Sequence, residues 1–100
     1  MQPLYLLATI LPDMAHAAEV EGILRRMMAL TRAEAGCELY DLVVDPQQPD
    51  TWFMIEKWSS REAWQAHMAS AHNVQGNEDL RGMLRGPTQL TFWEAKGDDG

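Results

Sequence analysis

The spacing of apolar side chains along the chain switches between the repeat of a strand and the repeat of a helix. A short apolar run over residues 4–10, ended by Pro12, predicts a strand. From residue 17 to residue 35 apolar side chains recur every three or four positions, which predicts an amphipathic helix of about five turns. Gly36 then supplies the left-handed backbone position at which such a helix ends.

Two further strands are predicted in the middle of the chain. Residues 37–45 alternate between apolar and polar side chains, and residues 51–58 form the next strand. The segment between them, residues 46–50, contains two prolines and predicts a turn that no strand could continue through. The two strands therefore form a hairpin.

The last part of the chain is predicted to contain both helix and strand. Ser59 followed by Glu62 fits a capping box, so we expect a second helix to begin there and to reach about residue 71. Beyond it we predict a loop over residues 73–77, a short additional helix over 78–84 and a last strand over 88–95.

The predicted order of elements is strand, helix, strand, strand, helix, strand. This is the split βαβ order of the ferredoxin-like fold, an α+β arrangement in which an antiparallel sheet carries its helices on one face. A length of 100 residues corresponds to a single domain, which we place at residues 1–96. We expect the polar residues 97–100 to form a disordered tail.

The predicted sheet is apolar on both faces. On the third strand Trp52, Met54 and Trp58 point to one side, while Phe53 and Ile55 point to the other. Two helices on the same side of the sheet can cover only one of these faces. We therefore expect a homodimer in which two sheets pack face to face.

Charge and composition exclude several classes of partner. A formal net charge of −7, with eight scattered basic residues, argues against nucleic acid, whose phosphates need clustered Lys and Arg. A single cysteine permits neither an internal disulfide nor a multi-cysteine zinc site. The start of the chain lacks the basic residues of a signal peptide, and the apolar run 4–11 is too short to span a bilayer. We expect a cytoplasmic protein that binds neither membranes nor a nucleotide cofactor, since no glycine-rich phosphate loop is present.

Glu56 is the first candidate for chemistry. By strand parity it shares a face with Trp52 and Trp58, where an unpaired carboxylate is costly. One interpretation is a structural carboxylate that is hydrogen-bonded to a helix or to Arg32 or Arg61. The other is an acid or base, or a group that orients a histidine.

The histidines supply further candidates. His67 lies within the second predicted helix beside Trp64, on the side that should meet the sheet. It is either an imidazole at the edge of the core, bonded to a backbone carbonyl, or a base that accepts a proton near neutral pH. We expect His72 to cap the end of this helix and His16 to be solvated. The three positions do not show metal-ligand spacing, so no metal site is predicted.

Cys37 and the aromatic residues have ordinary structural explanations beside functional ones. Cys37 is predicted to be a small buried hydrophobe rather than a nucleophile, since no basic neighbour lowers its pKa. Tyr40 either contributes its phenol to a pocket or packs with its hydroxyl at the rim. The four tryptophans serve the core and a dimer contact, or form aromatic walls for a flat substrate.

Together these residues resemble the antibiotic biosynthesis monooxygenase (ABM) domain family. The family pattern is a helix ending in Thr-Arg-x-Glu-x-Gly-Cys with a following Tyr, then a Phe-x-x-Glu-x-Trp strand and a helix with His-x-x-Ser-x-His. The matching residues are Thr31, Arg32, Glu34, Gly36, Cys37, Tyr40, Phe53, Glu56, Trp58, His67, Ser70 and His72. With the strand order, the resemblance covers essentially the whole chain.

The resemblance implies a dimeric α/β barrel with a pocket between sheet and helices in each subunit. It also implies a cofactor-independent monooxygenase that oxidises quinols or phenolic aromatic compounds with O2. On this basis His67 is expected to be the base and Glu56 to orient it or relay its proton. The residues expected to bind substrate are Tyr40, Trp52, Trp58, Trp64 and His72.

Other functions within this fold are left open by the sequence. Haem-degrading relatives use an asparagine on the first strand, whereas residues 4–9 contain none, so we do not expect haem breakdown. An isomerase of small phosphorylated hydroxycarbonyl compounds would need a cationic pocket, which Arg32 or Arg61 would have to supply. A module that binds aromatic molecules without catalysis, for example in a stress response, is the third possibility.

Overall fold

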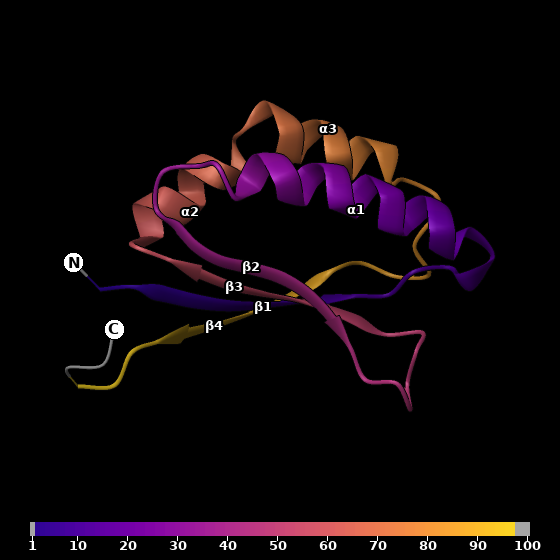
Figure 1. The fold of residues 1–100 in the computed structure, drawn as a ribbon, viewed down its shortest axis with the longest axis horizontal. Coiled ribbons are helices and arrows are strands. Elements are labelled where there is room, and N and C mark those ends of the chain that lie inside the picture. Colours follow the sequence, from indigo (N-terminus) through magenta and orange to yellow (C-terminus); the bar gives the residue numbers. More distant parts are fainter. Residues whose placement is uncertain (1, 98–100) are drawn as a thin grey trace.

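The computed structural model describes residues 2–97, in which three α-helices and one short 3₁₀ helix pack over a four-stranded sheet (Figure 1). The fold is the predicted α+β ferredoxin-like arrangement. Residues 98–100, most of the predicted disordered tail, lie outside the described residues. In chain order the elements are β1 Leu4–Ile10, η1 Met14–His16, α1 Ala17–Thr31, β2 Cys37–Val44, β3 Trp52–Trp58, α2 Arg61–Met68, α3 Ala71–Asp79 and β4 Gln89–Glu94.

The strands form one antiparallel sheet in the order β2-β3-β1-β4, with all helices on one face (Figure 1). The register places Glu56 of β3 between Leu6 of β1 and Tyr40 of β2. Residues directly opposite each other in neighbouring strands point to the same side of a sheet. A carboxyl group and a phenol therefore lie side by side on the face that the helices cover.

The core fills the space between this face and α1. On β1 every second side chain is buried, as expected for a strand with one covered face. On α1 the buried positions recur at steps of three and four residues, which confirms the predicted amphipathic helix. The buried side chains of these two elements are Leu4, Leu6, Ala8, Ile10, Val20, Ile23, Leu24, Met27, Met28 and Thr31.

The end of α1 differs from the prediction. The last helical residue is Thr31, and residues 32–36 form turns in which the Glu34 N–H still donates to Thr31 O at 3.0 Å. Gly36 has a φ of 86°, but it ends this turn segment rather than the helix. A Cβ at Gly36 would lie 2.6 Å from both Ala63 Cβ and Ser59 Oγ. The glycine thus allows the turn to pack against the start of α2, and this packing overrides the helical tendency of the sequence.

The region after β3 also corrects the sequence analysis. In place of one helix from 59 to about 71, α2 and α3 are separate helices, and residues 73–77 are helical rather than a loop. Ser70 explains the division: its hydroxyl donates to His67 O at 2.6 Å and accepts from the Asn73 N–H at 3.3 Å. It therefore closes one helix and caps the next. The predicted helix over 78–84 is wrong as well, because α3 ends at Asp79.

Gly76 was expected to lie in a loop, but it lies in α3, at the point where this helix packs against α1. A Cβ at Gly76 would overlap the side chain of Met27 on α1. Its absence allows α3 to lie directly against α1. After α3 the chain runs back beside the segment that follows β1, where Asp13 N donates to Met83 O at 2.9 Å and Arg85 N donates to Leu11 O at 2.8 Å.

The sheet face opposite the helices has no cover among residues 2–97 (Figure 1). By register its apolar side chains come from all four strands, and several are substantially exposed: Leu39 at 36%, Val43 at 39%, Ile55 at 38% and Trp93 at 52%. Strand β4 is exposed along its whole length. The predicted homodimer remains a prediction, and this face is the surface that it requires.

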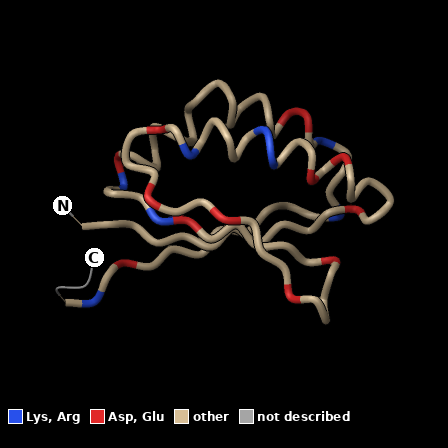
Figure 2. The backbone as a smooth tube through the Cα atoms, in the orientation of Figure 1, with Lys and Arg blue, Asp and Glu red and all other residues tan. Residues whose placement is uncertain are grey.

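Charged residues are spread along the helices, turns and strands, and the basic ones among the described residues are not gathered in one segment (Figure 2). Among the described residues no helix has the length and apolar character needed to cross a membrane.

The observed cap of α2 can be tested against the predicted one. Ser60, not Ser59, is the N-cap: its Oγ accepts from the Ala63 N–H at 3.1 Å. We expect Ser60→Ala to lower the free energy of unfolding by about 1 kcal/mol. Ser59→Ala should change it by less than about 0.5 kcal/mol. Urea unfolding of both variants makes the measurement, and an equal or larger loss in Ser59→Ala would contradict this assignment of the cap.

Candidate active site

A cavity of about 200 Å³ lies between the helix-facing side of the sheet and the helices. Its walls are mostly apolar and come from β1, α1, α2, α3 and the start of β4. Three residues with ionisable side chains line it: Tyr40, Glu56 and His67. Among the described residues no Lys or Arg lines this cavity. The site therefore combines an apolar interior with a few groups that can donate or accept protons.

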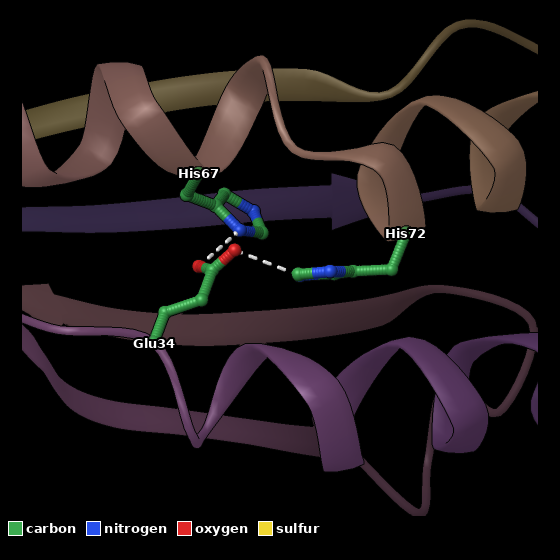
Figure 3. A group of neighbouring side chains, drawn as sticks. All are labelled: Glu34, His67 and His72. Carbon is green, nitrogen blue, oxygen red and sulfur yellow. Dashed lines mark hydrogen bonds and ion pairs between the residues drawn. The ribbon is translucent and has the colours of Figure 1, made fainter.

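His67 is the most tightly held of these groups. It lies on α2 with 3% of its surface exposed, and its Nδ1 is 2.9 Å from Oε2 of Glu34 (Figure 3). The ring also lies against Trp58, with centroids 4.8 Å apart, and meets the edge of Tyr40 at 5.6 Å. These contacts fix the orientation of the imidazole, so its position in the cavity wall is defined.

The contact with Glu34 also determines where the imidazole proton lies. A carboxylate accepts hydrogen bonds, so the neutral ring carries its proton on Nδ1 and leaves Nε2 as a proton acceptor. Burial lowers the pKa of His67 below its ordinary value, and the neighbouring Glu34 carboxylate opposes this shift only in part. A histidine held neutral and oriented by a carboxylate has the properties of a general base.

The Glu34 carboxylate that bonds His67 also bonds a second histidine, His72. Its Oε1 lies 2.8 Å from Nε2 of His72, so one carboxylate bonds two imidazoles (Figure 3). His72 is in the first turn of α3, not at the C-terminal end of a helix, so the predicted capping role is wrong. His72 does not line the cavity that His67 lines. Together with Gln75 and Asp79 it lines a separate pocket at the surface.

Glu56 is buried on β3 beside the same cavity. Its Oε1 accepts a hydrogen bond from Trp58 Nε1 at 3.0 Å, and 4% of the residue is exposed. Burial raises the pKa of Glu56 to about 7, and the bond from Trp58 offsets this shift only in part. Near neutral pH a substantial fraction of this carboxyl group is therefore protonated and can act as an acid.

The arginines considered as partners of Glu56 are engaged elsewhere. Arg32 donates to Tyr40 O and to Asp41 Oδ1, both at 3.0 Å, on the outer side of β2. The Arg61 guanidinium lies over the ring of Phe92, 5.5 Å from its centroid. Neither lines the cavity, so neither supplies the cationic pocket that a phosphorylated substrate would need.

The aromatic residues divide into those that line the cavity and those that support it. Tyr40 and Trp64 line it, and burial raises the pKa of Tyr40 far enough that the phenol stays protonated. Trp58 is fully buried behind His67 and Glu56, and Trp52 donates to Pro49 O at 2.8 Å outside the cavity lining. The Trp64 Nε1–H is buried and has no hydrogen-bond partner among the described residues.

Two residues of the site did not emerge as functional candidates from the sequence. Glu34 appeared only as part of a motif, because nothing in its spacing links it to a histidine 33 positions later. Asn73 lines the cavity, where its Nδ2 donates to Met68 O at 3.2 Å; the sequence analysis placed it in a loop. The position of Asn73 and the pairing of Glu34 with His72 both depend on the division between α2 and α3, which was not predicted from the sequence.

Comparisons with known proteins agree with this architecture. PA3566 from Pseudomonas aeruginosa is 31% identical, with a TM-score of 0.88 and coverage of 97% of each chain. Rv0793 from Mycobacterium tuberculosis is 27% identical, with a TM-score of 0.87 and the same coverage. A solved structure described as an antibiotic biosynthesis monooxygenase is 26% identical over 94% of this chain and 99% of that chain, with a TM-score of 0.87. No protein of curated function matches the sequence.

The family model described as antibiotic biosynthesis monooxygenase matches residues 3–78. This range extends from the first strand through the helix that carries His72, so it includes all three residues of the Glu34–His67–His72 group. Since the match covers most of the chain and the related structures share its fold over nearly their whole length, the protein belongs to the antibiotic biosynthesis monooxygenase (ABM) family.

Proposed function

We propose that this protein is a cofactor-independent monooxygenase that oxidises a phenol or quinol with O2. The observation that carries the proposal is His67, a neutral imidazole that lines an apolar cavity while Glu34 holds its Nδ1 at 2.9 Å. The membership of the ABM family and its relatives described as monooxygenases support the reaction class.

The chemistry follows from the substrate and the two proton-transfer groups. His67 Nε2 takes the phenolic proton, and the resulting phenolate is electron-rich enough to transfer an electron to O2. A new carbon–oxygen bond then forms on the ring, and the second oxygen atom leaves as water. A phenol plus O2 thus gives a quinone plus water, with all four electrons supplied by the ring. Glu56, protonated to a substantial fraction near pH 7, is the proton donor for the departing oxygen.

The cavity favours a small neutral aromatic substrate. A cavity of about 150 Å³ in a protein core is known to accept benzene, so about 200 Å³ fits one substituted ring. The buried Glu56 carboxyl and the absence of Lys and Arg among the described lining residues disfavour a phosphorylated compound. The buried Trp64 Nε1–H, which lacks a partner among these residues, is a candidate donor to a substrate oxygen.

We further propose that the protein acts as a homodimer through the uncovered sheet face. Apolar side chains of β2, β3 and β4 are exposed there, and β4 is exposed on both sides. A second sheet packed against this face would bury them. It would contact β4 on the side of Trp93, opposite to Leu90, which lines the cavity on the helix-covered side.

The reaction can be tested by O2 consumption with a panel of monocyclic phenols and quinols. We expect metal-stripped protein to consume O2 and to place one atom of isotopically labelled O2 in the product. His67→Gln should lower the rate by about 100-fold or more, since it removes the base. His16→Gln is the matched control, because His16 is exposed and pairs with Glu19 away from the cavity.

Two results of that experiment would reject the proposal. Full turnover by His67→Gln would remove this residue from the role of base. Saturable binding of aromatic compounds without O2 consumption above autoxidation would favour a binding module. Isomerisation of a phosphorylated hydroxycarbonyl compound without O2 consumption would favour the isomerase.

The dimer can be tested by a charge at the centre of the open face. Ile55 is 38% exposed there, so Ile55→Lys would place an ammonium group inside the proposed interface. We expect light scattering to show a dimer for the wild type and a monomer for Ile55→Lys. Val74→Lys is the control, since Val74 is 59% exposed on α3, away from this face. A monomeric wild type at micromolar concentration would contradict the proposal.

The burial of Glu56 predicts a pH-dependent stability. The folded carboxyl titrates near 7 and the unfolded one near 4.5, so the folded protein holds the proton more tightly. Stability is therefore highest below the unfolded pKa and falls as the pH rises through 7. Glu56→Gln keeps an oxygen for Trp58 Nε1 and removes the charge. The free energy of unfolding of Glu56→Gln, measured in urea, should rise relative to that of the wild type by roughly 2–3 kcal/mol between about pH 5 and pH 8. A constant difference would contradict the shift.

A further inference from the structure

The Glu34–His67–His72 group has a property beyond orienting a base. Each residue offers one atom that can coordinate a metal ion, and these three atoms all lie within 4.8 Å of one another. They come from three segments: the turn after α1, the helix α2 and the first turn of α3 (Figure 3). Two imidazole nitrogens and one carboxylate are a ligand set found in protein sites for transition metals.

The fold holds these three segments together independently of the histidines. Gly36 allows the turn that carries Glu34 to approach α2, where a side chain would collide with Ala63. Ser70 joins α2 to α3, because its hydroxyl bonds the end of one helix and the start of the other. The group is also sheltered, with exposed side-chain fractions of 3% for His67, 18% for Glu34 and 19% for His72.

We propose that Glu34, His67 and His72 form a binding site for one divalent transition-metal ion of the Zn²⁺ type. His67 would bind through Nδ1, His72 through Nε2 and Glu34 through its carboxylate. In tetrahedral geometry, metal–ligand distances of about 2.0–2.2 Å place neighbouring ligand atoms about 3.3–3.6 Å apart. The two histidine–carboxylate distances, 2.9 and 2.8 Å, would lengthen by about half an ångström to admit the ion. The two nitrogens, at most 4.8 Å apart, must approach, and His72, the most exposed of the three side chains, is the one that would move.

The ligand types determine which ion is preferred. Two of the three ligands are imidazoles, which suit Zn²⁺ and its first-row neighbours, whereas Mg²⁺ and Ca²⁺ prefer oxygen ligands. Glu34 supplies the one negative charge of the group. The ion would take the place of the two N–H protons that now lie between the rings and the carboxylate, and each ring would carry its proton on its other nitrogen.

Occupancy would change the chemistry of the cavity, a consequence that rests on the proposed function. A neutral imidazole bound to a metal through Nδ1 carries its proton on Nε2. The His67 nitrogen available to the cavity would then donate a hydrogen bond and could no longer accept a proton. His67 could act either as a metal ligand or as the base, but not as both at once, so the ion would inhibit turnover.

Calorimetric titration with ZnCl₂ tests the site without any substrate, so its result is separate from that of the oxygenation assay. We expect the metal-stripped wild type to bind one equivalent of Zn²⁺ per chain and to bind no Mg²⁺ under the same conditions. His72→Ala and Glu34→Gln should each weaken Zn²⁺ binding by at least about 10-fold, since each removes one of three ligands. His16→Ala should bind as the wild type does, although it removes a histidine that also pairs with a glutamate.

The outcomes separate the site from adventitious binding. Absence of Zn²⁺ binding by folded wild type would overturn the proposal. Equal affinity in Glu34→Gln and the wild type would overturn it as well, and so would a loss in His16→Ala as large as that in His72→Ala. Circular dichroism of each variant confirms the fold, and Glu34→Gln keeps the size of the side chain in case His72→Ala disturbs the start of α3.

Discussion

The carboxylate of Glu34 connects three parts of the structure that the rest of the site depends on. It accepts bonds from His67 on α2 and His72 on α3, while Glu34 itself lies in the turn that follows α1. A largely buried carboxylate is stable only when its oxygens have donors, and two imidazole N–H groups satisfy this need. These bonds add to the packing of Gly36 and the hydrogen bonds of Ser70, which already hold the turn and the two helices together, and they fix the tautomer of each histidine. His67 Nε2 is left as a proton acceptor because Nδ1 supplies one of the donors that the Glu34 carboxylate needs.

The cavity is lined by two groups, His67 and Glu56, whose uncharged forms are a base and an acid at the same pH. Burial lowers the pKa of His67 and raises that of Glu56, because a low dielectric disfavours whichever form is charged. Near neutral pH the imidazole is available as a base and part of the carboxyl population as an acid, and no Lys or Arg among the described residues lines the cavity. Trp58 supports both groups, since its ring lies against His67 and its Nε1–H bonds Glu56. An uncharged phenol is expected to bind beside His67 and Glu56 more tightly than an anion does.

The sheet, its α+β topology and the first helix, apart from its C-terminal end, were predicted correctly from the sequence because they depend on local periodicity. Side-chain parity placed Glu56 on the covered face of β3, and helical spacing turned His67 toward the sheet. Arg32 and Arg61, which one interpretation considered as partners of Glu56, bond other residues, because ion pairs depend on tertiary distances that sequence spacing does not contain. The division between α2 and α3 was missed for a related reason: Ser70 acts as a cap only when both helices are in place. That error concealed the Glu34 group, since it put His72 at the wrong end of a helix.

The same error explains why no metal site was predicted. On one continuous helix, positions 67 and 72 are separated by five residues, which turns their side chains to different faces. The break at Ser70 re-aims His72, so the two rings approach one carboxylate from either side. In the proposed metal site, the presence of a cation in place of the protons between the rings would decide which nitrogen of His67 carries hydrogen. The break between α2 and α3 thus underlies both proposals, the acid–base role of His67 and its inhibition by a bound ion.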